Sequence, residues 1–465
     1  MRFDGRRAAM TEKAKRDCAL AGLFAAYVFL MLTMLRIANH AGDGFLPTAA
    51  QEKVYYALQV FVLLGYFAHA LVRSRVRGKA ETALLAAALA LYFAAFAVLL
   101  FGKSTPFYLA CAFAASLSLG YLSGSVHEQM SHAAALGSPV ALCGGTGYAL
   151  GVAGQYLLQL RRESPLLIPV SALAFAVFAA LLLRAPAPDG CAKGASGEAP
   201  TPRRRLILAA AISAILLLFS SFYNSYIHHL QISSGYVEYN VYTWPRLMML
   251  PCSLLFALIG DKRGGRFVPL TALCIALAAL LNSVLTGSAG AYWLNMCLFY
   301  FSLAAAVSYY HLVFWRLAPG TKHPALWAGM GRMLDSAMVL PSALLHLSAL
   351  PPAAVLTIDV AGLAVLIVLM ALGGDFVFAA PAGPAAPAPD AETRLRRFAE
   401  TYGLTPRETA LLRELVLTED KQDAIAQRLA IQKSTVQFHT TSLYRKTGAS
   451  TRSGLSELFY NLKDE

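Results

Sequence analysis

Residues 404–461 read LTPRETALLRELVLTEDKQDAIAQRLAIQKSTVQFHTTSLYRKTGASTRSGLSELFYN, and this stretch decides the fold of the last part of the chain. Thr405 can cap a helix, Pro406 suits its first position, and Glu408 stands where its carboxylate can reach back to the cap. The sequence therefore predicts a helix that begins at Pro406 and is fixed at its start by side-chain hydrogen bonds.

Two further helices follow, with a tight turn between them. The first is predicted at about 421–429 and the second at about 433–447, because Gly448 is a usual residue just past a helix end. The outer face of the second helix is polar and basic. Two short helices in this arrangement are typical of a helix-turn-helix, whose second helix enters the major groove of DNA.

The sequence motifs in this stretch are more specific than the helix-turn-helix pattern. The segments LTPRE, IAQRL, STVQFH and YRKTGAS resemble, in order and spacing, the LuxR-type DNA-binding domain of bacterial transcription regulators, over roughly residues 400–463. The resemblance implies a four-helix domain that binds double-stranded promoter or operator DNA. The alternative from the residues alone is a helical bundle with no DNA partner.

The resemblance also implies site residues. The positions that match its base-reading residues are Gln437, Phe438 and Thr441. The positions that match its contacts to the DNA backbone are Lys433, Arg445 and Lys446, and the predicted DNA-binding set also includes Ser434 and Thr435.

This sequence departs from the family in three ways. Near Thr418 the family's glycine is replaced and one residue is inserted, and Gln437 replaces a common Lys or Arg. Thr440 and Thr447 stand where the family usually has apolar core residues. We expect a different operator from the altered base-reading residue, and modest stability from the two threonines.

The rest of the chain has a different composition. Of the 465 residues, 57% are hydrophobic and only 14% are charged, whereas an ordinary soluble domain is about one quarter charged. Residues 394–465 hold 12 of the 39 Lys and Arg and 9 of the 26 Asp and Glu, so most of the +13 charge lies in the apolar part. The sequence predicts an all-α polytopic membrane domain with a small soluble tail.

Long apolar runs mark the membrane spans, each of which needs about 20 residues. A loop rich in Pro, Gly and Ala, 184–205, divides them into two six-helix halves, 18–183 and 206–372. The twelve predicted spans are 18–38, 54–72, 80–101, 106–126, 137–158, 165–183, 206–227, 241–260, 267–286, 290–315, 325–347 and 352–372.

The predicted domains are a membrane domain at 1–373, a linker at 374–393 and the DNA-binding domain at 394–465. The linker contains AAPAGPAAPAP, whose prolines favour an extended chain. The membrane domain carries twenty Lys and Arg in the segments predicted inside and four in the outer loops, which places both termini in the cytoplasm. We therefore expect a multi-pass protein of the bacterial inner (cytoplasmic) membrane.

One inner loop is more informative than the others. Residues 260–266, GDKRGGR, resemble the short D-(R/K)-x-G-R loop of major facilitator transporters. The corresponding first-half loop, RSRVRGK, keeps the charge but not the pattern. The resemblance implies a transporter-like membrane domain, and the alternative is an ordinary basic inner loop.

Ionisable groups inside a bilayer are costly and by default mark function. Arg246 is predicted in the eighth span with no obvious local partner, which favours an anion or a cavity. Arg332 and Asp335 share one face of the eleventh span and either pair with each other or contact a ligand. His311, in the tenth span, is either a packing residue or a ligand contact. These four form the predicted ligand-binding set, and two buried arginines favour an anionic or phenolic, aromatic-rich molecule.

No motif for catalysis, a cofactor or a metal is found, and the seven cysteines have no metal-ligand spacing. The sequence therefore predicts a membrane-bound, ligand-sensing transcription regulator that is not an enzyme. Its last helix, at about 453–462, carries four apolar residues that form core or pair two copies on DNA. Two alternatives remain: a small-molecule transporter with a regulatory DNA-binding tail, and a membrane scaffold whose tail binds protein.

Overall fold

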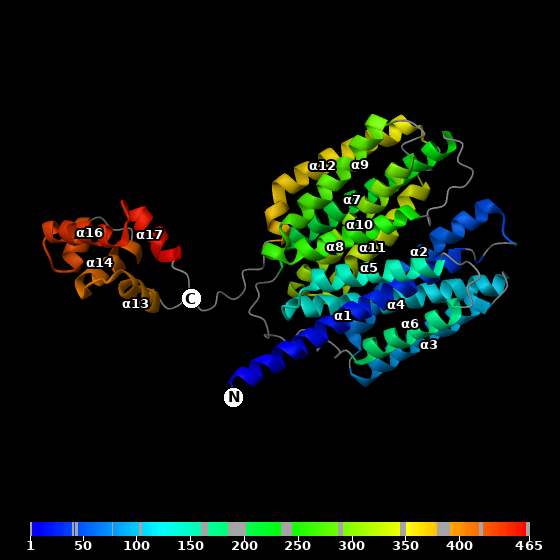
Figure 1. Cartoon of the computed structure of the whole chain (residues 1–465), viewed down its shortest axis with the longest axis horizontal. Coiled ribbons are helices and arrows are strands. Elements are labelled where there is room, and N and C mark those ends of the chain that lie inside the picture. Colours follow the sequence, from blue (N-terminus) through cyan, green and yellow to red (C-terminus); the bar gives the residue numbers. More distant parts are fainter. Residues whose placement is uncertain are drawn as a thin grey trace. The chain divides into compact units, whose positions relative to one another are not determined.

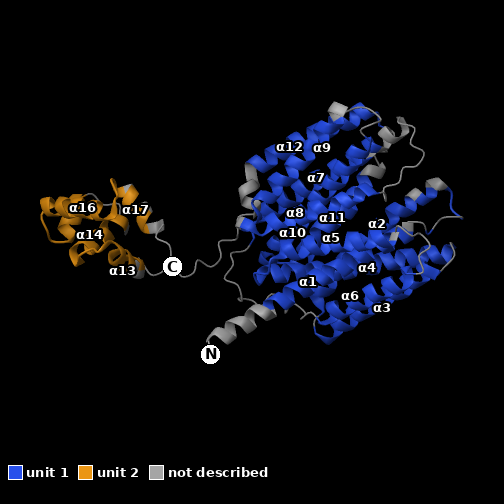
Figure 2. Ribbon diagram, viewed as in Figure 1, with its two compact units in different colours: residues 1–381 blue, residues 382–465 orange. Residues whose placement is uncertain are grey.

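Figure 1 shows the computed structural model of the chain, which is built from helices. No strand occurs among the residues that the structure describes. Those residues are 2–39, 41, 45–76, 78–101, 105–159, 166–184, 201–233, 244–286, 292–344, 350–378, 391–417 and 422–461. The chain forms two compact units, Met1–Pro381 and Ala382–Glu465 (Figure 2).

The first unit contains twelve long helices in its described part, in register with the twelve predicted spans. They are α1 (Arg2–Asn39), α2 (Thr48–Arg75), α3 (Lys79–Phe101), α4 (Pro106–Ala135), α5 (Val140–Gln159), α6 (Leu167–Arg184), α7 (Arg203–Ser233), α8 (Met249–Gly260), α9 (Phe267–Thr286), α10 (Tyr292–Leu317), α11 (Pro324–Leu344) and α12 (Pro352–Phe378).

Eight of the described helices are long and apolar enough to cross a membrane: α1, α2, α3, α4, α6, α7, α10 and α12. The segments Trp244–Gly260 and Phe267–Ser283 are shorter apolar helices. The described part of the chain thus holds a multi-span helical unit, and the count of twelve spans stays a prediction.

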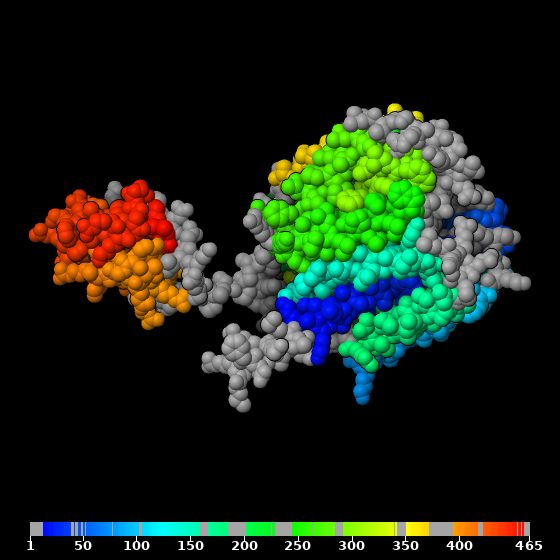
Figure 3. Space-filling view, viewed as in Figure 1, coloured from blue at the N-terminus to red at the C-terminus, as the bar shows by residue number. Residues whose placement is uncertain are grey.

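Burial separates inner helices from outer ones. In α10 72% of the most apolar window is buried, against 28% in α3, 17% in α6 and 22% in α12. The outer three carry exposed leucines, valines and isoleucines, which in a bilayer would face lipid. The helices α1–α6 and α7–α12 form two groups that lie side by side (Figures 1 and 3).

Several helix boundaries differ from the prediction, and three of these differences affect the loops and the linker. Helix α4 continues to Ala135, through most of the segment 126–136 that lies between two predicted spans. The described part of the predicted span 241–260 is a short 3-10 turn, η1 (Trp244–Met248), followed by α8. Helix α12 runs to Phe378, into the predicted linker, and 379–390 lie outside the described residues.

The loop predicted to be transporter-like, residues 260–266, makes hydrogen bonds between the two halves. Directly after α8, the carboxylate of Asp261 accepts hydrogen bonds from the backbone N–H of Ala141 (3.1 Å) and Leu142 (2.9 Å), at the start of α5. Arg316, at the end of α10, donates to the same carboxylate at 2.9 Å. Gly264 has a φ of 68°, a conformation that favours glycine. The loop is therefore shaped to hold Asp261 against a helix N-terminus.

The second unit has its own core. It contains α13 (Ala391–Tyr402), α14 (Pro406–Leu417), α15 (Gln422–Arg428), α16 (Lys433–Thr447) and α17 (Arg452–Asn461). Side chains of all five helices meet in one apolar cluster. Helix α13 was not predicted, because its sequence is strongly charged; only Leu395 and Phe398, three residues apart, mark its buried face.

Close packing of α2 on α4 depends on glycine. A Cβ atom on Gly120 would overlap the backbone oxygen of Val62, and one on Gly65 would overlap that of Leu117. Neither oxygen belongs to a flexible side chain that can move aside. The two helices can therefore approach this closely only with glycine at both crossing positions.

We predict that Gly120→Ala lowers the apparent Tm of the purified full-length protein, because overpacking a tight contact costs about 1–3 kcal/mol. The matched control is Gly362→Ala in α12, where the nearest atom to a new Cβ lies 4.0 Å away. Thermal unfolding followed by helical circular dichroism measures both. Equal Tm values for the two variants would contradict the packing assignment.

Candidate functional site

Helix α16 divides its residues between core and surface. Val436, Thr440, Leu443 and Thr447 are buried on one face. The hydroxyls of Thr440 and Thr447 donate to the carbonyls of Val436 (2.8 Å) and Leu443 (2.9 Å) in their own helix. Both threonines therefore occupy core positions without leaving a buried donor unsatisfied.

The opposite face of α16 is exposed. It carries Gln437, Phe438, Thr441 and Arg445, with Lys433 and Ser434 at the helix start. Thr435 is half-buried. The sequence-predicted residues thus lie on one helix, and most of them face outward from the unit.

A tight turn connects α15 to α16. The N–H of Ile431 donates to the carbonyl of Ala426 at 3.0 Å, and Ala430 adopts a positive φ of 51°. This is the left-handed conformation that ends many helices, here without a glycine. Ile425 of α15 and Val436 of α16 are fully buried in the shared core, which fixes the angle between the helices.

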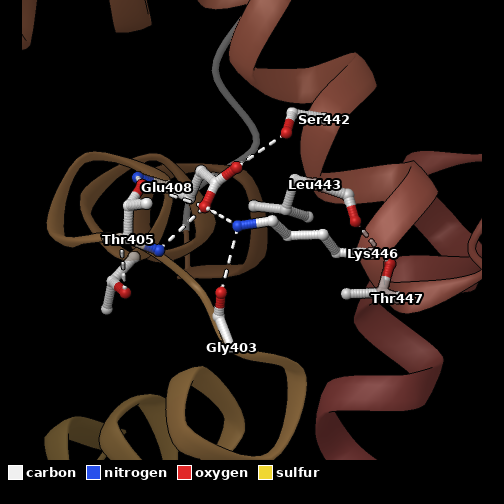
Figure 4. A network of polar contacts seen from close by, with 8 residues as sticks. Gly403, Thr405, Glu408, Ser442, Leu443, Lys446 and Thr447 are labelled. Atoms are coloured by element: carbon white, nitrogen blue, oxygen red, sulfur yellow. Dashed lines mark hydrogen bonds and ion pairs between the residues drawn. The ribbon is translucent and has the colours of Figure 1, made fainter.

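The carboxylate of Glu408 fixes α14 to α16 (Figure 4). It accepts hydrogen bonds from the backbone N–H of Thr405 (2.8 Å), the hydroxyl of Ser442 (2.7 Å) and the ammonium of Lys446 (2.7 Å). The predicted capping interaction at the start of α14 is confirmed. The contacts to α16 were not predicted, because no local pattern links positions 34 and 38 residues apart.

Burial alone would raise the pKa of the Glu408 carboxyl. The Lys446 ammonium and the hydrogen bonds from Thr405 and Ser442 outweigh burial and lower this pKa to about 2. The carboxylate is therefore ionised at neutral pH and holds the unit together as a charge-assisted hub.

The three cations predicted to contact the DNA backbone differ in the interactions that they already make within the unit. Lys446 donates to Glu408 and to the carbonyl of Gly403 (3.0 Å), so part of its charge is used within the unit. Lys433 lies 2.8 Å from Asp423, an ion pair exposed on both sides. Arg445 is exposed and makes no ion pair within the described residues. All three DNA contacts stay predictions.

The first unit contains a partly open cavity of about 340 Å³. Its lining comes from α1, α2 and α5 of the first half and from η1, α7, α8, α10 and α11 of the second. The four residues of the predicted ligand-binding set, Arg246, Arg332, Asp335 and His311, all line it. Residues from three separate predicted spans thus meet in one place.

Arg332 is the main polar feature of the cavity. It pairs with Asp335, one helical turn along α11, and the hydroxyl of Tyr310 donates to Asp335 at 3.4 Å. Tyr27 and Tyr148 line the same space. The Nε of Arg332 has no hydrogen-bond partner among the described residues. The cavity therefore offers a half-buried cation, an unused N–H donor and several phenols.

Arg246 has a partner that the sequence did not suggest. It is 5% exposed in η1, and its guanidinium donates to the side-chain oxygen of Gln155 in α5 at 2.8 Å. The sequence offered no local partner for Arg246, and Gln155 lies 91 residues away in the other half. The contact bridges the halves at the cavity wall.

Comparison with known proteins separates the two units. The family of bacterial regulatory proteins named luxR matches residues 403–458, which include α14, α15 and α16 and most of α17. These residues are a LuxR-type helix-turn-helix domain. No curated protein sequence matches the chain.

Among solved structures, the chain resembles the proton:xylose symporter XylE of the major facilitator superfamily, solved with 6-bromo-6-deoxy-D-glucose bound. The TM-score is 0.53 at 12% identity, over 80% of this chain and 96% of that chain. At this identity the likeness concerns the fold alone. The membrane-type helices therefore have a major-facilitator-like arrangement, in a chain that ends in a LuxR-type domain.

A buried aromatic cluster next to the cavity was not predicted from the sequence. The indole N–H of Trp315 donates to Nδ1 of His127 at 3.0 Å, and the rings of His127 and His311 stack with centroids 5.0 Å apart. His127 is fully buried in the part of α4 that lies between two predicted spans. Its only sequence signal was a histidine next to an apolar run.

Other polar groups join α2 to α3 and α4. Arg73 donates to Glu128 at 2.9 Å and to Glu81 at 2.7 Å, and His69 lies 3.1 Å from Glu128. None of these residues is among those lining the cavity. In the LuxR-type domain, Leu455 and Phe459 of α17 are buried in the core, which accounts for part of that helix's apolar surface.

We predict that Glu408→Gln lowers the free energy of unfolding of residues 382–465 by about 1.5–3 kcal/mol at pH 7, the range for hydrogen bonds to a charged group. Because the native pKa of Glu408 is lowered to about 2, its stabilisation is present above the ordinary glutamate value and is lost as pH falls towards 2. The difference between wild type and variant should shrink over that range in urea titrations.

The matched control is Asp423→Asn, which removes the exposed ion pair with Lys433. Such pairs contribute about 0–1 kcal/mol, so this variant should unfold near the wild-type urea concentration at pH 7. If the Glu408→Gln variant were as stable as the control at pH 7, the hydrogen bonds of the Glu408 carboxylate would not be needed for the stability of this unit.

Proposed function

We propose that this protein is a membrane-bound transcription regulator. Its major-facilitator-like unit binds a small molecule in the cavity between the halves, and its LuxR-type domain binds promoter or operator DNA. The observation that carries the proposal is the presence in one chain of a LuxR-type domain with an exposed polar helix face and of a charged cavity. We assign it no enzymatic activity.

The exposed face of α16 supports DNA binding. Gln437 and Thr441 lie one turn apart on it, with hydrogen-bonding groups suited to base edges. Arg445 continues the same face with a cation for a phosphate. We propose that two copies bind two half-sites, since helix-turn-helix domains commonly pair on DNA about one helical turn apart.

The cavity supports binding of an anionic or phenolic, aromatic-rich molecule. Arg36, Arg246 and Arg332 bring three cations to its wall, and Asp335 brings one carboxylate. The aromatic lining, including Tyr27, Tyr148 and Phe299, suits a planar ring. His311 faces the same space, with its Nε2 unbonded among the described residues. A carboxylate or phenolate on an aromatic ring matches this set of donors.

The distribution of positive charge among the loops supports a proposed location in the cell. The excess of Lys and Arg in alternate loops supports an inner membrane protein with both termini in the cytoplasm, where DNA is. The second candidate function is a transporter with a regulatory tail, because the fold resembles that of a symporter. Uptake of labelled aromatic acids into vesicles separates the two, since a sensor binds the compound without accumulating it.

We predict that Arg445→Ala and Lys433→Ala weaken binding to all DNA sequences and reduce the salt slope by about 0.9 per lost phosphate contact. Gln437→Ala instead relaxes base preference, by about 1–3 kcal/mol for a good contact. Gel shifts of residues 382–465 on selected and random duplexes over a range of salt measure both. Arg396→Ala, an exposed cation on α13 outside the matched domain, is the control. The same loss on both duplexes for Gln437→Ala and Arg445→Ala would refute the roles.

We predict that Arg246→Gln and Arg332→Lys shift the dose response of a promoter reporter by about tenfold or more, equal to about 1.4 kcal/mol of ligand binding. Inducers come from a panel of aromatic carboxylates and phenols. The control is Lys262→Ala, which removes an exposed cation outside the cavity. Membrane insertion of each variant is checked by immunoblotting. Unchanged dose dependence in both inserted cavity variants would place the ligand elsewhere.

A further inference from the structure

Phe438 is a large hydrophobic residue on the surface of the LuxR-type domain. It is 71% exposed, and in the described part of the second unit it is the one large hydrophobic side chain left open to solvent. The other large apolar side chains that the structure describes in this unit are buried in its core or packed against it. Phe438 therefore contributes nothing to the core that would explain its presence.

Its position on the helix is opposite to the core. Phe438 follows Val436 by two residues, about 200° around an α-helix, and Val436 is fully buried. The neighbouring ring of His439 meets it edge-on, with centroids 5.6 Å apart. The phenyl ring thus stands on the outer face of α16, with a neighbour on one side.

The surroundings distinguish between possible partners. Gln437 and Thr441 adjoin Phe438 on the exposed face, and Arg445 lies one turn further. A protein partner is expected to meet a wider apolar patch, whereas here a single ring stands among hydrogen-bonding and cationic groups. In the major groove the apolar group at a base edge is the C5-methyl of thymine.

We infer that Phe438 contacts the C5-methyl group of a thymine in the operator, next to the base pair read by Gln437. The inference rests on the proposed DNA binding and specifies part of the sequence that is bound. Because glutamine pairs best with adenine, each half-site should contain an adenine and a nearby thymine.

The experiment uses the full-length protein in lipid nanodiscs. Binding sites are first selected from a random double-stranded library. Each thymine of the selected half-site is then replaced by uracil, which removes only the methyl group. We expect one thymine position at which uracil weakens wild-type binding about fourfold, the loss for one buried methyl-sized group.

Variants assign that methyl to its contact. Phe438→Ala should bind the thymine duplex about fourfold more weakly and show no further loss with uracil. Phe438→Leu should keep the uracil penalty, because it keeps an apolar contact. Thr441→Ser removes the other methyl group on this face and should also keep the penalty at the Phe438 position.

Two results would overturn the inference. One is an equal uracil penalty in wild type and Phe438→Ala. The other is a Phe438→Ala variant that dissociates a DNA-free dimer in sedimentation while its uracil penalty is unchanged, which would assign the ring to a second copy. If the folded wild-type protein selects no sequence, the proposed DNA binding itself fails, a result distinct from both.

Discussion

A charge removed from water needs a partner, and ion pairs in both units supply one. Arg332 pairs with Asp335 beside the cavity, and Asp261 is held between Arg316 and the start of α5. In the LuxR-type domain, Glu408 carries out the same task between two helices. Each pair either joins two helices or lies within one. The pairs therefore fix which helix positions meet, which an apolar core alone would not specify.

This requirement limits which residues remain for function. Lys446 has the charge to bind a phosphate, yet its ammonium lies against Glu408 and Gly403. Arg445, the next residue along, has no such duty within the described residues and faces outward. Arg445 is therefore a better candidate than Lys446 for contacting a DNA phosphate. The same reasoning singles out Phe438, which is large, apolar and unused by the core.

Sequence reasoning succeeded where the pattern is local. Hydrophobic runs placed twelve helices, and the spacing of Thr405 and Glu408 identified a capping interaction that the structure contains. It failed where contacts join distant positions. Gln155 could not be linked to Arg246, nor His127 to Trp315, because helix packing rather than local order brings them together.

The candidate site shows the same division. The exposed face of α16 was predictable because helical periodicity alone separates it from the buried face. The cavity was predictable only as a set of costly ionisable residues: their meeting depends on the packing of α10 and α11, which sequence spacing does not encode. Helix α13 was missed because two apolar residues among charges are too few to mark a buried face.

Helix α10 connects the cavity to the contact between the halves. His311 lines the cavity, and Arg316, five residues further along α10, holds Asp261 against the start of α5. A ligand can shift an equilibrium only through contacts that differ between its states. The Arg246–Gln155 bridge and the Asp261 contact both cross between halves, so both must change if the halves move. A molecule that competes for Arg246 acts on one of these bridges directly and, through α10, on the element that carries the other.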